Sequence, residues 1–576
     1  MLKLFRFLAP DRGRLVLVLV LALAQSVGSL LLPRLMADIV DHGIVRGDQG
    51  VFYRTGGLML LMSIVASLCA IAGSYYSAHV ATGFGRRLRG AIFARVEHFA
   101  IHQFDRFGSA SLVTRTTNDT TQVQQMLIMM LMVVIVAPMM AIGGVLLAVS
   151  QDAQLAWVLI AVMPIMAVVF ALIMRRSVPL STAMQAKIDR LNLVLGEGLS
   201  GVRVIRAFDR GTAQRARFDE ANLDLTNTAI TVNRLTAILM PALIMMLNFT
   251  SVAILWVGSH RIEAGVMQVG AMIASLQYAM QILFSVFMVT AMFVMLPRAS
   301  ASANRINEVL ELEPEIVDPA AGRAQAASTR GHVEFRNVTF QYPGAEEPAL
   351  ADVSFTARPG EITAIVGGTG SGKSTLAGLI PRFYDVNAGR VLVDGVDVRD
   401  MTQADLRARI GFVPQRAMLF TGTVAANIRY GLEQATDDEV RHAAEVAQAI
   451  DFIDAMPEKF ASPIAQGGLN LSGGQKQRLA IARAIVRTPD IYVFDDTFSA
   501  LDFATDARLR AALKNETATA TVFVVAQRIS TVINADRIIV LDDGRVVGVG
   551  THAELLERSP VYREIVESQV SLDEVA

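Results

Sequence analysis

The sequence is poor in cysteine and in charge, and each shortage excludes a class of protein. It has one cysteine in 576 residues, so no disulfide can form within the chain. Cys69 lies in an apolar run, where a small buried hydrophobic side chain is the simplest interpretation. Charged residues make up only 18% and the net charge is −1, which leaves no overall electrostatic attraction to nucleic acid. No nucleic-acid partner is therefore expected.

Long apolar runs are abundant instead. Hydrophobic residues make up 53% and the mean hydropathy is +0.43, values too apolar for an ordinary soluble protein. A chain of 576 residues is also too long for one core, so at least two domains are expected. Six runs before residue 297 are long enough to cross a bilayer, which takes about 20 residues. The predicted spans are Leu15–Met36, Gly56–Tyr76, Met126–Val149, Leu155–Met174, Leu235–Gly258 and Val269–Leu296.

Basic residues are distributed unevenly between the loops, and this sets the expected orientation. The long loops after the second and fourth runs are rich in arginine, whereas the three short loops have few basic residues, such as Arg46, Arg54 and Arg261. Because positive charge favours the cytoplasmic side, both termini and the two long loops are expected there. Residues 1–10 indicate either a short amphipathic helix on the membrane surface or a plain cytoplasmic helix.

The long loops have few glycines and a regular apolar spacing, so the spanning helices are expected to continue beyond the membrane. Short turns are predicted near Phe104–Ser109 and Gly211–Phe218. A polar helix, Ala299–Leu312, then leads into a segment rich in proline, alanine and glycine, after which strands and helices alternate. The expected fold class is multi-domain. An all-α six-helix transmembrane domain (residues 1–312) is followed by a linker (313–330) and a soluble α/β domain (331–576).

The stretch "EITAIVGGTGSGKST" is the strongest functional signal. It contains the pattern G-x-x-x-x-G-K-S from Gly367 to Ser374, with an apolar strand before it and a helical pattern after it. The glycines let backbone N–H groups surround phosphates, the lysine reaches the β- and γ-oxygens, and the serine can ligate Mg²⁺. The pattern predicts an α/β P-loop nucleotide-binding domain. Its candidate nucleotide-binding residues are Gly367, Gly370, Gly372, Lys373, Ser374 and Thr375.

Two further motifs point to phosphate and metal. Asp495 ends an apolar strand, where it is placed to hold Mg²⁺ through water, although an ordinary acid at a strand end is the alternative. In "LSGGQKQRLAIARAI", Ser472 precedes two glycines at the start of a predicted helix, which is a second anion-binding arrangement. One nucleotide does not need two such helix starts from one chain, so the second suggests a nucleotide held by a partner domain. Without the P-loop, a simple capped helix would be favoured.

The LSGGQ motif, the P-loop and the six preceding spans together resemble an ABC half-transporter of the exporter fold (type IV), over essentially the whole chain. The stretch "GEGLSGVRVIRAFDR", Gly196–Arg210, is similar to the segment before the second intracellular coupling turn of that family. The resemblance implies ATP and Mg²⁺ as cofactors and ATP hydrolysis as the activity. It also implies a multi-pass protein of the inner (cytoplasmic) cell membrane, with its nucleotide-binding domain in the cytoplasm.

In this family ATP lies between the Walker A of one domain and the signature of another, so a second half-transporter is an expected partner. The resemblance assigns Tyr342 in "FQYPG" to the aromatic that stacks on adenine. It assigns Gln415 in "GFVPQ" to the glutamine that reaches Mg²⁺ and senses the membrane domain. The implied metal ligands are Ser374, Gln415 and Asp495. Ser499–Asp502 corresponds to the D-loop that crosses between paired domains. The expected nucleotide contacts from the signature and D-loop are Ser472, Gly473, Gly474, Gln475 and Asp502.

Two positions depart from the family's pattern. The residue after the Walker-B aspartate is usually a glutamate, the general base for the attacking water, and here it is Asp496. A base must come within about 2.6–3.2 Å of the proton that it takes, and a shorter side chain should not reach it. The usual histidine after "FVVA" is replaced by Gln527, which cannot shuttle a proton. Because the signature is intact, we interpret the chain as the degenerate-site subunit of a heterodimeric multidrug-type exporter, whose partner performs most of the hydrolysis.

Three other functions are compatible with the sequence: a homodimeric exporter with slow hydrolysis, a siderophore-type importer with the exporter fold, and a non-transporting ATP-sensing regulatory subunit. The expected partners besides a second half-transporter are membrane lipid and a small hydrophobic substrate, a class that includes drug-like compounds, lipids and peptides. The methionine-rich run Met126–Met140 is compatible with an apolar binding surface, although packing or lipid contact is the preferred interpretation. Asn248, Gln277 and Gln281 are polar within spans and are expected to face a cavity or another helix.

Overall fold

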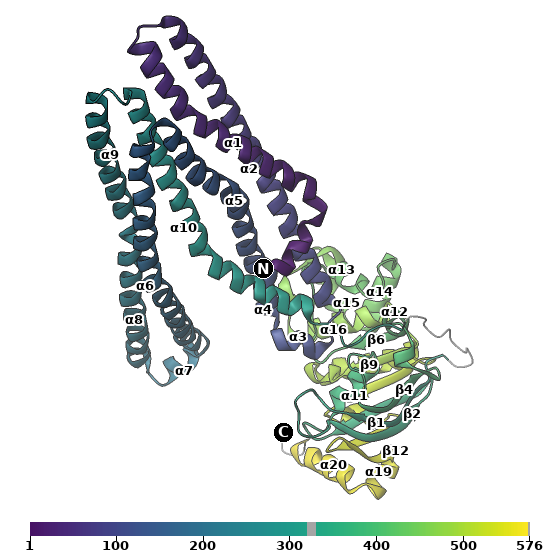
Figure 1. Cartoon of the computed structure of the whole chain (residues 1–576). Helices are drawn as coiled ribbons and strands as arrows, with labels where there is room; N and C mark the ends of the chain where they lie inside the picture. Colours follow the sequence, from purple (N-terminus) through teal and green to yellow (C-terminus); the bar gives the residue numbers. More distant parts are fainter. Residues whose placement is uncertain (320–329, 574–576) are drawn as a thin grey trace. The chain divides into compact units, whose positions relative to one another are not determined.

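The computed structural model describes residues 1–319 and 330–573, and these form two compact units (Figure 1). The N-terminal unit comprises Met1–Glu97 and Ser109–Leu312. The C-terminal unit comprises His98–Gly108 together with Glu313–Ala576, so a short early segment of the chain belongs with the later unit. The predicted linker, residues 313–330, lies partly outside the described residues, which omit 320–329.

The N-terminal unit is built from long helices, because a backbone surrounded by lipid must satisfy its polar groups within the helix. Among the described residues, six helical stretches are long and apolar enough to cross a membrane, and the predicted number and order of spans are confirmed. The helices are α1 (Arg12–Asp38), α2 (Gln49–Glu97), α4 (Ser109–Thr114), α5 (Thr120–Gln151), α6 (Ala153–Ser200), α7 (Val202–Ala207), α8 (Gly211–Ala237), α9 (Leu239–Glu263) and α10 (Val269–Glu311).

The helices of this unit pack in pairs, with α1 along α2, α5 along α10, and α6 along α8 and α9 (Figure 1). Polar side chains inside the spans join neighbouring helices. Gln281 Nε2 of α10 donates a hydrogen bond to the Ser29 carbonyl of α1 at 3.1 Å, and the Tyr278 hydroxyl donates to the Leu30 carbonyl at 3.2 Å. For Gln281 the structure therefore supports the helix–helix interpretation.

The six apolar stretches are 43 to 53 residues long, so they extend well past the roughly 20 residues that a bilayer needs. The expected helical extensions are confirmed. The first predicted turn, Phe104–Ser109, contains a helix break at Gly108, where φ is +73°. The second turn lies earlier in the chain than predicted: it is formed by Phe208–Arg210, and residue 211 already begins α8. Asp209 makes this turn with a left-handed φ of +48°.

A buried carboxylate directly before α5 contacts α10 in the N-terminal unit. The Asp119 side chain is fully buried and accepts hydrogen bonds from Ser302 Oγ at 2.9 Å and from Arg305 Nε at 2.8 Å. A second guanidinium nitrogen of Arg305 also donates to this carboxylate. The exposed pair Lys3–Glu311, at 2.6 Å, offers a contrast because its side chains are 70% and 51% exposed.

Arg305→Ala is expected to destabilise the protein strongly, because it leaves the buried Asp119 charge without its cation. The expected cost is about 1–3 kcal/mol, that of a buried acceptor that loses its partner, because the Arg305 side chain is itself 48% exposed and water reaches it. Lys3→Ala, the matched control, should cost less than about 1 kcal/mol because water screens an exposed pair. Thermal melting of both variants in detergent measures the difference. Equal melting temperatures for the two variants would show that the Asp119 contact carries no special weight.

The C-terminal unit is an α/β structure with a central six-stranded sheet. The strand order is β12-β11-β3-β10-β9-β6, and β10 runs parallel to both β3 and β9. A second sheet has the order β2-β1-β4-β5, and β7 pairs with β8. The strands are β1 (Val333–Phe340), β2 (Leu350–Ala357), β3 (Ile362–Gly367), β4 (Ala388–Val393), β5 (Val396–Asp397), β6 (Ile410–Val413), β7 (Gly422–Thr423), β8 (Pro463–Ile464), β9 (Ile491–Asp495), β10 (Thr521–Val525), β11 (Arg537–Asp542) and β12 (Arg545–Gly550).

The helices of this unit are mostly short. They are α3 (Ile101–Phe107), α11 (Lys373–Leu379), α12 (Gln403–Ala408), α13 (Val424–Arg429), α14 (Asp437–Val446), α15 (Ile450–Asp454), α16 (Gly473–Ile485), α17 (Phe503–Glu516), α18 (Ile529–Val532), α19 (His552–Arg558) and α20 (Pro560–Asp573). The expected fold class, a six-helix membrane unit followed by an α/β unit, is confirmed.

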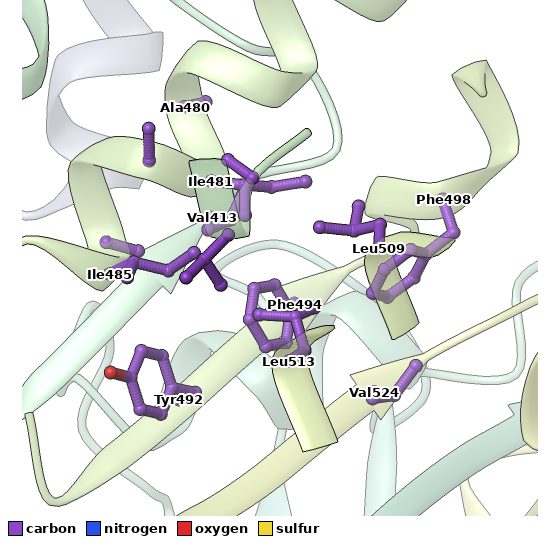
Figure 2. Close-up of a cluster of buried hydrophobic side chains, with 14 of the residues drawn as sticks. Val413, Ala480, Ile481, Ile485, Tyr492, Phe494, Phe498, Leu509, Leu513 and Val524 are labelled. Carbon is purple, nitrogen blue, oxygen red and sulfur yellow. The ribbon is translucent and has the colours of Figure 1, made fainter. Parts of the chain in front are cut away.

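Strand β9 packs against a hydrophobic core formed with helices α16 and α17 (Figure 2). Phe494 of β9 is completely buried among Ile481 and Ile485 of α16 and Leu509 of α17. All five residues of β9 are buried, which is typical of a central strand covered on both faces. The acids at the end of β9 are therefore held on a rigid element.

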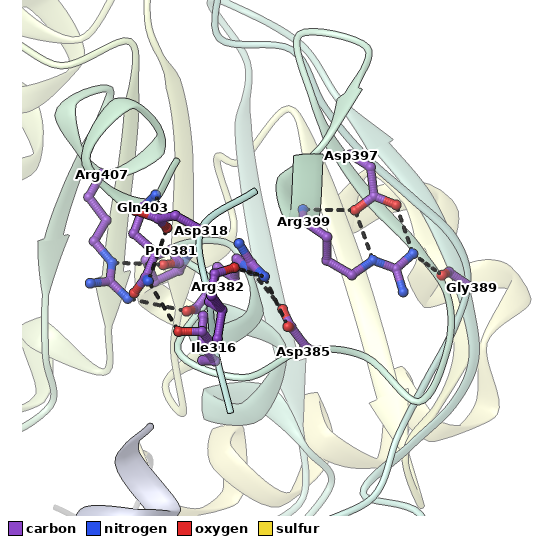
Figure 3. Close-up of polar contacts among 11 residues, drawn as sticks. Ile316, Asp318, Pro381, Arg382, Asp385, Gly389, Asp397, Arg399, Gln403 and Arg407 are labelled. Carbon is purple, nitrogen blue, oxygen red and sulfur yellow. Dashed lines mark hydrogen bonds and ion pairs between the residues drawn. The ribbon is translucent and has the colours of Figure 1, made fainter. Parts of the chain in front are cut away.

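The chain enters the C-terminal unit through a set of polar contacts (Figure 3). Asp318 Oδ1 accepts a hydrogen bond from the Gln403 backbone N–H at 2.9 Å, and Gln403 Nε2 donates to the Ile316 carbonyl at 3.4 Å. Arg382, which is 3% exposed, forms an ion pair with Asp385 at 2.7 Å. These contacts fix the first residues after the N-terminal unit.

The segment His98–Gly108 docks on the same entry region. Gln103 Nε2 donates to the Glu313 carbonyl at 2.9 Å, and its Oε1 accepts from the Ala100 backbone N–H at 3.1 Å. His102 Nε2 lies 3.0 Å from a Glu315 carboxylate oxygen, and its ring stacks on Tyr384 with centroids 6.4 Å apart. Helix α3 is thereby fixed to the C-terminal unit although it precedes most of the chain.

Candidate functional site

The loop between β3 and α11 has the backbone shape that phosphate binding requires. Gly367, at the end of β3, has φ +157°, and a Cβ there would lie 2.2 Å from the Leu541 carbonyl oxygen. Gly372 has a left-handed φ of +93°, and a Cβ there would lie 2.6 Å from the Ala349 carbonyl oxygen. Only glycine fits both positions, so the loop can turn tightly from the strand into the helix.

Lys373 lies across this loop. Its Nζ donates to the carbonyl oxygens of Gly367 at 3.0 Å and Gly368 at 2.5 Å. Burial lowers the pKa of the ammonium, and the nearby Asp496 and Asp495 charges oppose that shift. A half-buried ammonium beside loop carbonyls is poised to exchange those contacts for phosphate oxygens.

Ser374 and Asp495 form an oxygen pair next to the loop. Ser374 Oγ donates to Asp495 Oδ1 at 2.9 Å, although the two residues are far apart in the sequence. Burial raises the pKa of the Asp495 carboxyl, and Asp496 adds to that effect, whereas the Ser374 hydroxyl opposes it. A hydroxyl and a carboxylate are oxygen ligands of the kind that Mg²⁺ prefers, with phosphate and water completing the shell. The residues present therefore fit the metal.

Asp496 has two amide donors on a single oxygen. Gln415 Nε2 donates to Asp496 Oδ2 at 3.0 Å, and Gln527 Nε2 donates to the same oxygen at 2.9 Å. Asp496 itself is 8% exposed and has a left-handed φ of +45°, which is uncommon for a residue other than glycine. The structure thus brings together the two unusual residues, and it places the Gln415 amide on Asp496.

The position of Gln527 is fixed from the C-terminal helix. Gln569 Nε2 of α20 donates to the Gln527 carbonyl at 2.7 Å, and its Oε1 accepts from the Ile529 backbone N–H at 2.8 Å. Gln569 therefore holds the loop on both sides of Arg528. Nothing in the local sequence around Gln569 indicated this role, because the contact spans 42 residues.

Tyr342 lies in an aromatic cluster beside the loop. Its hydroxyl is 2.9 Å from Thr375 Oγ1 of α11, and its ring meets Tyr384 edge-on with centroids 5.5 Å apart. Phe340 contacts both rings, at 4.9 Å and 5.2 Å. Burial raises the pKa of Tyr384 to about 12, so its phenol stays neutral. Tyr384 was not predicted from the sequence, since it lies outside every motif.

The signature stretch forms the start of helix α16. The Ser472 hydroxyl accepts from the Gln475 backbone N–H at 3.3 Å, and Gln475 Oε1 accepts from the Ser472 backbone N–H at 2.9 Å, which is a capping box. A Cβ on Gly473 would meet nothing within 4 Å, whereas one on Gly474 would lie 3.2 Å from the Ala500 carbonyl oxygen. The helix start is thus open on the side of Gly473.

Asp502 caps the following helix. Its Oδ1 accepts from the Thr505 backbone N–H at 2.9 Å, and this N–H is the main cause of the lowered pKa of the carboxyl. The side chain lies on the exposed N-terminus of α17, so helix capping is its role within this chain. Both the signature and the D-loop therefore present well-formed helix starts.

Two family models match the chain. The model for the ABC transporter transmembrane region matches residues 15–286, and the model for the ABC transporter matches residues 350–499. The chain is 45% identical to an uncharacterized ABC transporter ATP-binding protein of Mycobacterium tuberculosis, over 97% of this chain and 96% of that protein. It is 37% identical to the Bacillus subtilis ABC transporter ATP-binding protein YfiB, over 99% and 98% of the two chains.

More distant similarities extend to relatives with a stated activity. The chain is 31% identical to the ATP-dependent lipid A-core flippase of Chromobacterium violaceum, over 95% of this chain and 94% of that protein. Among solved structures, it superposes on a bacterial Atm1-family ABC exporter with ATP bound, with a TM-score of 0.81 and 26% identity. That superposition covers 97% of this chain and 98% of the other.

Proposed function

The chain belongs to the ABC transporters, and from that premise we propose that it is the degenerate-site subunit of a heterodimeric exporter. Its membrane unit spans the inner membrane six times and its ATP-binding domain lies in the cytoplasm. In this proposal residues 1–312 form the transmembrane domain, 313–330 the linker and 331–576 the nucleotide-binding domain. The observation that carries the proposal is the double amide contact on Asp496.

Binding of ATP is assigned to one set of residues. Tyr342 stacks on adenine, the loop from Gly367 to Thr375 surrounds the phosphates, and Lys373 leaves the loop carbonyls for the phosphate oxygens. Ser374 and Asp495 hold Mg²⁺, which neutralises phosphate charge when it is bound. Each of these positions has the type of residue that ATP binding requires, so the site is proposed to bind ATP well.

Hydrolysis at the same site is proposed to be weak. Asp496 is one methylene shorter than the usual glutamate, and each carboxylate oxygen offers two lone-pair positions. Both positions at Oδ2 are used by Gln415 and Gln527, at 3.0 Å and 2.9 Å. The two amides thereby fix the orientation of the carboxylate and leave only Oδ1 to accept a proton, on a side chain that is one methylene too short. Gln527 also has no ionisable proton, so it cannot replace a histidine in proton transfer.

The signature is proposed to serve a partner. Ser472 and Gln475 form an ordered helix start, and the space around Gly473 is open, so phosphate groups presented by another domain can approach the backbone N–H groups. Exposed apolar side chains near α7 support a partner as well. Leu199, Val204 and Phe208 are 69%, 60% and 73% exposed, a pattern typical of an interface that is covered in an assembly.

The proposed substrates are hydrophobic compounds, lipids among them. A relative with 31% identity is a lipid A-core flippase, and another with 31% identity is a fatty acid transporter of Mycobacterium bovis.

The proposed mechanism is alternating access: the two nucleotide domains close on ATP, and hydrolysis at the partner's site reopens them. ATP retained at this chain's own site keeps the domains partly in contact between cycles.

The heterodimer proposal is tested by measuring ATP turnover in lipid, first for this chain alone and then for its complex with a candidate partner half-transporter. The chain alone is expected to be nearly inactive, and the pair active, because only the pair combines an intact base with an intact signature. Brisk turnover by the chain alone would instead identify it as a homodimeric exporter with a working Asp496.

A further inference from the structure

The N-terminal unit contains an apolar groove between its first helical turns and α5. One wall is formed by the N-terminal helix Leu2–Asp11 and the start of α1, and the other by a single face of α5. Leu127, Leu131 and Val134 form that face at spacings of four and three residues. The groove has a volume of about 400 Å³, which lies in the range of pockets that hold small organic ligands.

The groove has two cations at its edge and no acid in its lining. Arg6 and Arg12 line it, and both are exposed. Among the residues that the structure describes, neither arginine has an ion-pair partner, and the Arg6 guanidinium lies over the Phe7 ring, 5.1 Å from its centroid. The nearby Asp11 does not neutralise them, because its carboxylate is engaged by Arg87 at 2.6 Å and by Arg14 at 2.9 Å.

The position of the groove in the membrane follows from the orientation of the chain. The N-terminus is cytoplasmic, so Arg6 and Arg12 lie at the cytoplasmic surface and the leucine wall of α5 extends from there into the hydrocarbon layer. Arginines at this level attract anionic headgroups. A ligand that matches both the two arginines and the apolar face of α5 has a negative headgroup and a hydrocarbon chain.

We propose that this groove is a specific site for an anionic phospholipid of the cytoplasmic leaflet, with its phosphate between Arg6 and Arg12 and an acyl chain along Leu127, Leu131 and Val134. The site rests on the membrane location of the chain and is independent of the heterodimer proposal. A lipid bound here also fixes the N-terminal helix, which is joined to α2 through the Asp11–Arg87 ion pair.

The test measures lipid retained by the purified full-length protein in mixed phosphatidylglycerol and phosphatidylcholine, by native mass spectrometry. Arg6→Gln with Arg12→Gln is expected to weaken retention of phosphatidylglycerol by about tenfold or more, since each basic residue near the surface contributes measurably to anionic lipid binding. Phosphatidylcholine retention should not change. Ala9→Trp, at an exposed position that lines the groove, should displace the lipid sterically while leaving both arginines in place.

The control is Arg175→Gln with Arg176→Gln, which removes two exposed cations directly after the fourth predicted span, outside the groove. It should leave phosphatidylglycerol retention unchanged. An equal loss in this control would overturn the proposal, because general surface charge would then explain the binding. Unchanged retention in Ala9→Trp would also overturn it. Release of the lipid on ATP addition would mark it as transported cargo and overturn the proposal, and so would a crosslink from Ala9→Cys to a second protein chain, which would show that protein fills the groove.

Discussion

Asp496→Glu combined with Gln527→His is expected to increase ATP turnover at this chain's own site by about 10²-fold, because a positioned general base contributes about 10²–10⁴. The longer carboxylate extends toward the attacking water, and the histidine removes one of the two amide donors that now hold Asp496 Oδ2. The measurement uses the heteromeric complex with the partner's Walker-B glutamate replaced by glutamine. All remaining turnover then comes from the site of this chain.

The matched control is Asp496→Asn in the complex with an unmodified partner. Turnover should stay near its original value, since the partner's site performs most of the hydrolysis. Loss of turnover in this control would show that Asp496 is already a working base, and the interpretation of the double amide contact would then be wrong.

Gly473→Asp should abolish turnover at the partner's site while leaving the fold of this chain intact. The new side chain enters open space, since a Cβ at residue 473 has no neighbour within 4 Å. An acid in the first turn of α16 even suits the helix dipole. The same negative charge, however, faces the phosphate groups that a partner presents. Like charges brought together in a closed interface weaken binding by several kcal/mol. A loss of about 10²-fold or more is therefore expected.

Turnover of the complex and thermal melting of the variant are measured together. Unchanged melting with lost turnover supports a signature that serves the partner, and Gly473→Ala, which adds bulk without charge, should be the milder variant. Full turnover in Gly473→Asp would show that no phosphate group approaches this helix start, and the proposed sandwich would then be excluded.

Much of the fold follows from local patterns. The apolar runs were sufficient to predict the number and order of spans, because a helix of about 20 apolar residues is the simplest way to cross a bilayer. The glycine pattern also predicted the loop between β3 and α11, where Gly367 and Gly372 have backbone conformations that other residues rarely adopt. These features depend on residues that are close in the sequence, so they can be predicted from the sequence alone.

Features set by distant residues could not be read in the same way. The second turn was predicted at Gly211–Phe218, but the chain turns at Phe208–Arg210, because Asp209 accepts a left-handed backbone and Gly211 can begin a helix. The contacts of Gln415 and Gln527 on one oxygen of Asp496 join residues 81 and 31 positions apart. Each glutamine was identified singly, and only the folded chain shows that both amides reach the same atom.

The docking of helix α3 on the C-terminal unit has a consequence for synthesis of the protein. Gln103 bonds to a carbonyl 210 residues later in the chain, and Tyr384, on which His102 stacks, is later still. At about 5–20 residues per second, a ribosome needs roughly 10–40 s to produce the Glu313 carbonyl after Gln103 has emerged. During that interval four more spans insert, and the residues on which α3 docks have not yet been synthesised. A C-terminal unit cut at residue 313 therefore lacks one of its own parts, however well the remainder folds.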